Sequence, residues 1–168
     1  MTDLSHRLLV EFLNEYQDYL KEPVADYGSN EKEGAGKVVT TLASGGLYAY
    51  RGLDLTTGVD LMEPIKGKYG TGICMDLLEH VLNPFIVAEN ITNSLKKNAL
   101  LFVTAPFSWI PHNYPKDYWR FSEDGLKALF PKLKCLKLRM VRDKERELIK
   151  LKDMMMLLRV VGVFKNER

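Results

Sequence analysis

Apolar residues recur along this chain with the two periods of regular secondary structure. Over 3–20, leucine and aromatic residues return every three or four positions, which predicts an amphipathic helix that packs over one edge of a sheet or covers a ligand as a lid. A second helix, over 31–43, is expected to end at a glycine pair. Two more are expected over 84–97, where a proline opens the first turn, and over 123–130, where a serine precedes two acidic residues.

Shorter apolar runs between these segments predict strands. The run ALLFVTA is apolar throughout, as expected of a central strand covered on both faces, and the last two runs predict an antiparallel pair at one sheet edge. Strands are expected over 23–27, 47–55, 57–62, 71–76, 99–105, 133–141 and 158–164. Because strands and helices alternate through most of the chain, the pattern is typical of an α/β fold.

Composition limits the class of protein. A chain of 168 residues, 46% apolar and 27% charged, fits one soluble domain, with an N-terminal helix over 1–21, a core over 23–130 and a strand pair over 131–168. The formal net charge of +2 implies no polyanionic partner, and no apolar run reaches the length of a membrane span. Cys74 and Cys135 are expected to be buried thiols, and no Cys/His cluster has zinc spacing, so we expect a cytoplasmic location and no metal.

Two acidic residues stand at the ends of the first two predicted strands. In PVADYGSN, Asp26 ends the first strand and Gly28 follows it by two places, while in YRGLDL the second strand ends at Asp54. An acid at the second strand end can accept hydrogen bonds from both hydroxyls of a ribose. The spacing therefore predicts a nucleotide-like ligand at the carboxyl ends of these strands.

Three blocks of this chain resemble the class I S-adenosylmethionine-dependent methyltransferases, specifically the small type 11 branch. They are VADYGSN with YRGLDL, then GICMDLLEHVLNP, then LLFVTAPF followed by HNYPKDYWRFS. The resemblance implies a Rossmann-like three-layer α/β/α sandwich around a mostly parallel seven-stranded sheet with an antiparallel edge strand. It also implies S-adenosyl-L-methionine as cofactor and methyl transfer to a small soluble acceptor, such as a sugar or another metabolite.

The resemblance also implies roles for particular residues. Those expected to bind the cofactor are Asp26, Gly28, Asn30, Asp54, Leu55, Asp60, Leu61, Met75, Asp76 and Leu77. The loop after the central strand would contact the substrate through Asp117, Tyr118 and Arg120, with Arg120 possible as an ion-pair partner of Asp117 or Glu79. Strand-end acids such as Asp54 also serve ordinary turns, and this structural role remains an alternative.

Two histidines are candidates for the removal of the acceptor's proton, because imidazole titrates near neutral pH. His80 follows the fourth predicted strand, and its alternative is a structural hydrogen bond at a helix entry. His112 lies in the proline-rich loop and is the favoured base, with loop bracing as its alternative.

Other functions stay open at the level of sequence. The family's first loop reads acid-x-Gly-x-Gly-x-Gly, whereas this chain has Gly28, Asn30 and Lys32 at the glycine positions. This departure favours a degenerate binding module that keeps the fold without catalysis. A nucleic-acid methyltransferase is a further alternative, although the basic segment 132–152 alternates with acidic and apolar residues as a solvated edge does. The expected partner is a small-molecule substrate, not a nucleic acid or a membrane, and the sequence predicts no oligomeric state.

Overall fold

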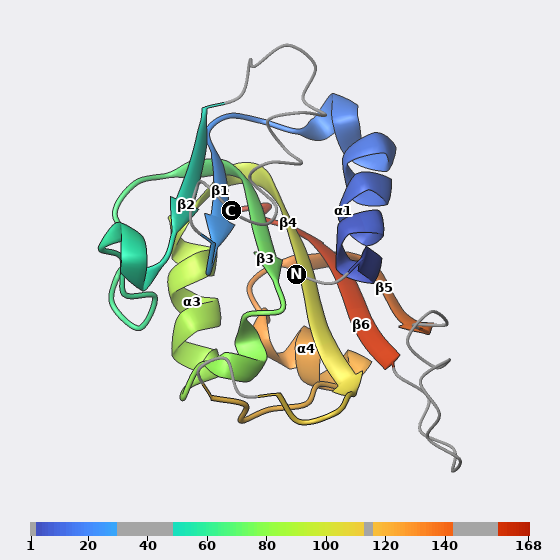
Figure 1. Ribbon diagram of the computed structural model, residues 1–168. Coiled ribbons are helices and arrows are strands. Elements are labelled where there is room, and N and C mark those ends of the chain that lie inside the picture. The colour runs from blue at the N-terminus through green and yellow to red at the C-terminus, as the bar shows by residue number, and fades with distance from the viewer. Residues whose placement is uncertain (1–2, 30–48, 113–115, 143–157) are drawn as a thin grey trace.

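The structure is a computed structural model that describes residues 3–29, 49–112, 116–142 and 158–168. Its strands form one six-stranded sheet in the order β2-β1-β3-β4-β6-β5. The strands are β1 (Val24–Tyr27), β2 (Tyr50–Leu53), β3 (Tyr69–Met75), β4 (Leu95–Ser108), β5 (Lys134–Arg142) and β6 (Leu158–Lys165). Figure 1 shows β4 running through the middle of this sheet.

The sheet is parallel on one side and antiparallel on the other. β1 pairs in parallel with β2 and β3, and β3 pairs in parallel with β4. β6 runs antiparallel to both β4 and β5, so the predicted antiparallel pair at the sheet edge is confirmed, with the reversed strand one place in from the edge. The carboxyl ends of β1, β2, β3 and β4 therefore lie at the same edge of the sheet as the start of β6.

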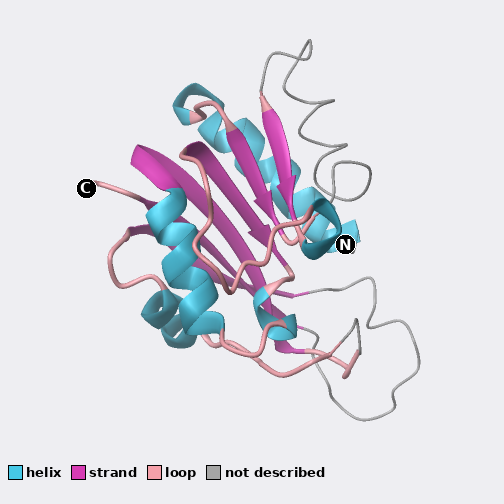
Figure 2. Ribbon diagram, turned by 90° about the vertical axis from the view of Figure 1, so that its left-hand side faces the viewer, coloured by secondary structure: helices cyan, strands magenta, loops and turns pink. Residues whose placement is uncertain are grey.

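Helices cover both faces of the sheet, as the predicted three-layer sandwich requires (Figure 2). The apolar stripe of α1 (Asp3–Tyr16) packs on one face, where Phe12 stacks on Phe102 at a ring distance of 4.6 Å. On the other face lie α3 (Pro84–Ser94), capped by Asn83, and α4 (Glu123–Leu129), capped by Ser122. α1 thus covers the middle of the sheet, where the sequence predicted a position over an edge.

Side chains alternate between the two faces of the sheet along each strand, and this determines which helices each residue packs against. In β4, Leu100 and Phe102 belong to the core under α1, while Leu101 and Val103 belong to the core under α3 and α4. In β6, Val161 and Val163 likewise face α1. Arg159 lies two positions before Val161 in β6, so this buried arginine is also on the α1 face, near the carboxyl end of β4.

The predicted strand over 57–62 is wrong. This segment forms a 3-10 turn, Leu55–Thr57, which ends at Gly58 in the left-handed region, and turns follow to the start of β3. The Asp54 carboxylate and the Thr57 hydroxyl each bond the other end of this turn, which keeps the backbone out of a strand. The described sheet therefore has six strands where seven were expected, and the predicted helix over 31–43 lies outside the described residues.

A glycine near the start of β3 lets the preceding chain pass close to the sheet. Gly70, in β3, has no space for a side chain, since a Cβ there would lie 2.5 Å from the Lys21 carbonyl oxygen. The connection from α1 thus crosses closely over the start of β3. Within the described residues, no helix is long and apolar enough to cross a membrane.

Candidate functional site

The carboxyl ends of β1, β2 and β3 converge where the sequence predicted a nucleotide-like ligand. Tyr27 is in register with Leu53 on one side and with Cys74 on the other, and the Gly28 amide donates to the Leu53 carbonyl over 2.8 Å. Gly28 has φ +80°, and a Cβ on it would lie 2.6 Å from Leu77 Cδ1. Glycine is favoured at this turn because of its left-handed backbone angle, and a side chain there would also require Leu77 to shift.

Asp54 stands at the end of β2, on the same edge as Gly28. Its Oδ1 accepts from the Thr56 amide at 2.8 Å, so the carboxylate is held in place by the turn that follows. The side chain is only partly buried. Asp54 therefore has the structural role in a turn that was the alternative for a strand-end acid.

The other predicted cofactor residues divide into two groups. Leu55 is 72% exposed, and Asp60 caps its own turn by accepting from the Met62 amide at 2.9 Å. Leu61 belongs instead to the core under α3, and Asp26 is buried beneath α1, where it accepts from the Tyr50 hydroxyl at 2.7 Å. Asn30 lies outside the described residues. Neither Asp26 nor Leu61 has the exposure that direct contact with a ligand needs.

Burial also changes the acidity of Asp26. Removal from water raises the pKa of this carboxyl to about 7, and the hydrogen bonds from Tyr50 and Ser29 lower it only in part. Asp26 is thus a buried support of the first strand end, with an electrostatic cost that grows as it ionises.

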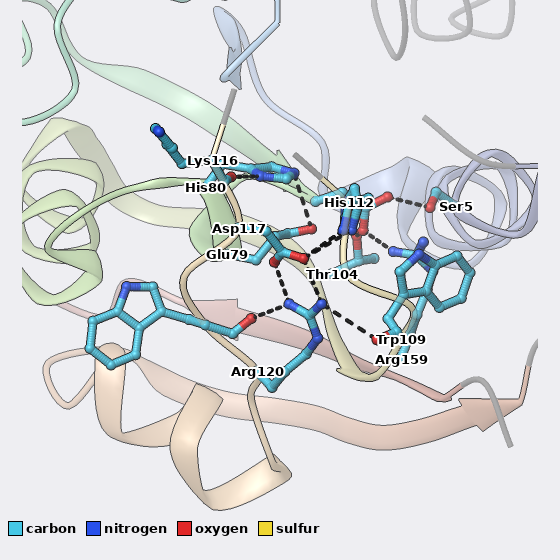
Figure 3. Close-up of polar contacts among 12 residues, drawn as sticks. Ser5, Glu79, His80, Thr104, Trp109, His112, Lys116, Asp117, Arg120 and Arg159 are labelled. Atoms are coloured by element: carbon cyan, nitrogen blue, oxygen red, sulfur yellow. Dashed lines mark hydrogen bonds and ion pairs between the residues drawn. The ribbon is translucent and has the colours of Figure 1, made fainter. Parts of the chain in front are cut away.

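Asp76, at the end of β3, is enclosed by its own protein partners. It adopts φ +51° and accepts from the Ser5 hydroxyl at 2.6 Å and the Thr104 hydroxyl at 3.0 Å. Arg159 forms an ion pair with it, and the same guanidinium lies 4.2 Å from the centre of the Trp109 ring. The predicted contact of Asp76 with a cofactor therefore competes with a network that joins α1, β4 and β6 (Figure 3).

The predicted catalytic and substrate residues come together one turn after Leu77. The His80 amide donates to the Leu77 carbonyl, and the His80 ring meets His112 edge to face at 4.9 Å. Asp117 lies 3.4 Å from His112 Nδ1 and accepts from the His112 amide at 2.8 Å. Figure 3 shows these side chains grouped at the end of β3, below the loop that carries His112.

The loop is fixed over β3 by charge and by backbone bonds. Arg120 forms an ion pair with Asp117, which confirms one of its two expected partners, and this holds the pKa of the Asp117 carboxyl well below its usual range. The amides of Tyr118 and Trp119 donate to the Glu79 carbonyl at 2.7 and 3.3 Å. Trp119 is 40% exposed and donates its indole N–H to the Val81 carbonyl over 3.0 Å, whereas Phe121 is buried.

The residue that sequence reasoning missed is Glu79. It is 1% exposed, and its Oε1 lies 3.8 Å from His80 Nε2. Burial, and next the charge of Asp76, raise the pKa of Glu79 to about 8. Its position before His80 in the LEHV block was the available signal, but the sequence does not show that the side chain turns inward.

Arg159 was missed for a different reason. It stands between a leucine and the valines of LRVVGVF, and an arginine within a buried strand is rare and normally requires a partner. The partner, Asp76, lies 83 positions away along the chain. The pairing of β6 with β4 brings the two together, and no local pattern in the sequence predicts it.

No protein-family model and no curated protein matches this chain. Solved structures do match it, and they place its fold with that of the class I S-adenosylmethionine-dependent methyltransferases. The fold implied by the sequence resemblance is thereby confirmed.

Three structures illustrate the match. A SAM-dependent methyltransferase from Methanosarcina mazei superposes with a TM-score of 0.63 at 15% identity, covering 90% of this chain and 96% of its own. The N-methyltransferase NodS from Bradyrhizobium japonicum, in complex with S-adenosyl-L-homocysteine, has a TM-score of 0.61 at 8% identity and coverages of 97% and 86%. The [4+2]-cyclase SpnF has a TM-score of 0.68 at 13% identity and coverages of 95% and 81%. These identities support the fold and not a shared reaction.

Proposed function

We propose that this protein is a methyltransferase that uses S-adenosyl-L-methionine and acts on a small soluble acceptor. The observation that carries the proposal is the meeting of Gly28, Asp54 and Leu77 at one sheet edge, directly beside the His80 and His112 cluster. A donor site and an acceptor site next to each other are what transfer between two bound molecules requires.

On the donor side, the residues present fit the cofactor. Gly28 lets the backbone come close to the ligand, and Asp54 would accept from the ribose hydroxyls while its turn keeps the carboxylate fixed. Leu77 lies against Gly28 and would flank the reactive end of the cofactor. When bound, the sulfonium supplies both the methyl group and its leaving group, so the protein's task is to align donor and acceptor.

On the acceptor side, the loop that carries His112, Asp117 and Arg120 would hold the substrate. Asp117 orients His112 through its Nδ1, and Arg120 in turn holds Asp117. His112 is about one-third exposed, so an acceptor entering from solvent could reach it. The His80 and His112 pair would position the acceptor and assist the loss of its proton.

A binding module without catalysis is the second candidate. The altered glycine pattern at Asn30 and Lys32 favours it, because glycines at these positions allow the close approach of the cofactor. The match to a [4+2]-cyclase shows that this fold carries more than one chemistry.

The test is calorimetry with S-adenosyl-L-homocysteine on the wild-type protein and on two matched variants. Asp54→Ala removes the carboxylate, whereas Thr57→Ala removes the other half of the same capping box and leaves the carboxylate in place. We expect binding to be lost in Asp54→Ala and retained in Thr57→Ala. Equal losses would assign Asp54 to the turn alone.

The absence of any heat or thermal shift in the wild-type protein at millimolar ligand would reject the methyltransferase proposal. Binding without turnover across a broad set of acceptors would instead favour the module without catalysis. Turnover with a radiolabelled methyl donor and any small acceptor would establish the enzyme.

A further inference from the structure

One buried carboxylate oxygen in this site is left without a partner. Glu79 Oε2 is inaccessible to solvent and forms no hydrogen bond with the residues that the structure describes. The two arginines whose charges act on Glu79, Arg159 and Arg120, are each bonded to another carboxylate. Buried carboxylates are ordinarily paired or coordinate a metal, and Glu79 Oε2 does neither among the described residues.

Two imidazoles stand beside this carboxylate. One oxygen of Glu79 and one ring nitrogen each of His80 and His112 all lie within 4.8 Å of one another. Ligands bound to a common metal ion at about 2.1 Å are separated by roughly 3 to 3.5 Å. A bound ion would therefore draw the three side chains together by about 1 Å, which side-chain rotations can supply.

The outer hydrogen bonds of both histidines are those expected of metal ligands. His80 Nδ1 faces the Lys116 carbonyl, which can only accept, so the proton belongs on Nδ1 and the lone pair on Nε2, the atom nearer Glu79. His112 Nδ1 faces two further acceptors, the Ile110 carbonyl at 3.3 Å and Asp117 at 3.4 Å. Metal-binding histidines commonly donate their other ring N–H to a carbonyl or a carboxylate in this way.

We propose that Glu79, His80 and His112 bind a divalent transition-metal ion at the acceptor side of the site. Two imidazoles and one carboxylate suit Zn²⁺ and its neighbours better than Mg²⁺ or Ca²⁺, which prefer oxygen ligands. Three protein ligands leave coordination positions open for a molecule from solvent. The expectation of no metal, drawn from sequence spacing, missed this set because its two histidines are brought together by the fold.

The ion would define the acceptor class, and this step rests on the proposed methyltransferase function. An acceptor hydroxyl bound at an open position becomes more acidic and releases its proton to water. The acceptor oxygen then forms a bond to the methyl carbon as the carbon–sulfur bond breaks, and the electron pair stays on sulfur to give S-adenosyl-L-homocysteine. The acceptor is thus a small molecule with a metal-binding hydroxyl, and the histidines act through the ion.

The experiment measures metal binding on its own. Untagged, metal-stripped protein is titrated with Zn²⁺ by calorimetry and with Co²⁺ by absorbance, which reports the ligand set. We expect one ion per chain and no thiolate band in the Co²⁺ spectrum. Glu79→Gln and His112→Ala should each weaken binding at least about 100-fold, and Asp117→Asn about 10-fold, because it removes only an outer hydrogen bond.

Two control variants test specificity. His6→Ala changes the remaining histidine, which is exposed on α1, and Cys135→Ser removes a partly exposed thiol. Both should bind the ion as the wild-type protein does. Circular dichroism shows whether each variant is folded, and His112, on a surface loop, is the variant expected to fold without difficulty.

Several results would overturn the metal site. These are the absence of Zn²⁺ binding in the wild-type protein, binding as tight as wild type in both Glu79→Gln and His112→Ala, or loss of binding in the His6 or Cys135 control. S-adenosyl-L-homocysteine binding is measured separately on the same samples. Zn²⁺ binding without cofactor binding would keep the metal site and reject the methyltransferase, and the reverse result would do the opposite.

Discussion

Asp76 and Glu79 are carboxylates three positions apart, one partly buried and one fully buried, and their surroundings differ. Asp76 accepts from Ser5 and Thr104 and pairs with Arg159, so each of its two oxygens has a partner within the protein. Glu79 keeps one oxygen, Oε2, without a partner among the described residues, and its carboxylate lies beside two imidazoles. The two side chains leave the same strand end toward different neighbours.

The difference separates a structural acid from one available for function. A carboxylate whose bonds are complete stabilises the elements that supply its partners, here α1, β4 and β6. A buried carboxylate with an open oxygen has an electrostatic cost that only a proton or a cation can offset. Sequence resemblance had assigned cofactor contact to Asp76, whose oxygens have partners within the protein, whereas Glu79 keeps an oxygen available to a metal ion.

The largest effect on stability is expected from breaking the ion pair between Asp76 and Arg159. Arg159→Met removes the buried cation of the pair and leaves the largely buried Asp76 without it, which should lower the free energy of unfolding by about 3 to 5 kcal/mol. Urea denaturation measures it. The matched control is Arg139→Met, which removes an exposed pair with Glu11 and should cost at most about 1 kcal/mol. Similar costs for both variants would show that the Asp76 network is not structural.

A pH-dependent effect is expected from Asp26, the third buried acid of this edge. Since burial raises the pKa of Asp26 to about 7 in the folded protein, its stabilising effect is complete below the unfolded value near 4. That stability is lost as pH rises toward 7, by on the order of 4 kcal/mol. Asp26→Asn should therefore become more stable relative to wild type between pH 5 and pH 8.

Urea denaturation of both proteins across this pH range measures the effect of Asp26→Asn. Asp124→Asn, an exposed acid in the first turn of α4, serves as the control and should show no such trend. A difference between Asp26→Asn and wild type that stays constant with pH would mean that Asp26 is ionised in the folded protein throughout.

The smallest effect is expected from the neutral partners of Asp76. Ser5→Ala removes one hydrogen bond to the carboxylate while Arg159 and Thr104 remain, so we expect a loss of about 1 to 2 kcal/mol. Thr104→Val should act similarly, and Ser108→Ala, at the same strand's end, should be close to neutral. Thermal unfolding compares the three, and a Ser5→Ala protein as stable as wild type would remove α1 from the network.

Much of the fold followed from local pattern. The α1 stripe, the apolar run of β4 and the caps of α3 and α4 each depend on neighbours in sequence, so their periods predict them. The segment 57–62 failed for a local reason as well, because the Asp54 and Thr57 capping box outweighed the short apolar run that suggested a strand. Gly28 and Asp54 met as predicted because parallel strands end at one edge.

The sequence by itself thus determined the elements, the alternation of layers and which strand ends would carry polar residues. Only the tertiary structure decided which carboxylates find all their partners within the protein and which keeps an oxygen without one. Arg159 reaches Asp76, and His112 reaches His80 and Glu79, through strand pairing and a loop fixed across the sheet edge. Burial and partnership depend on residues far apart along the chain, and no local period records them.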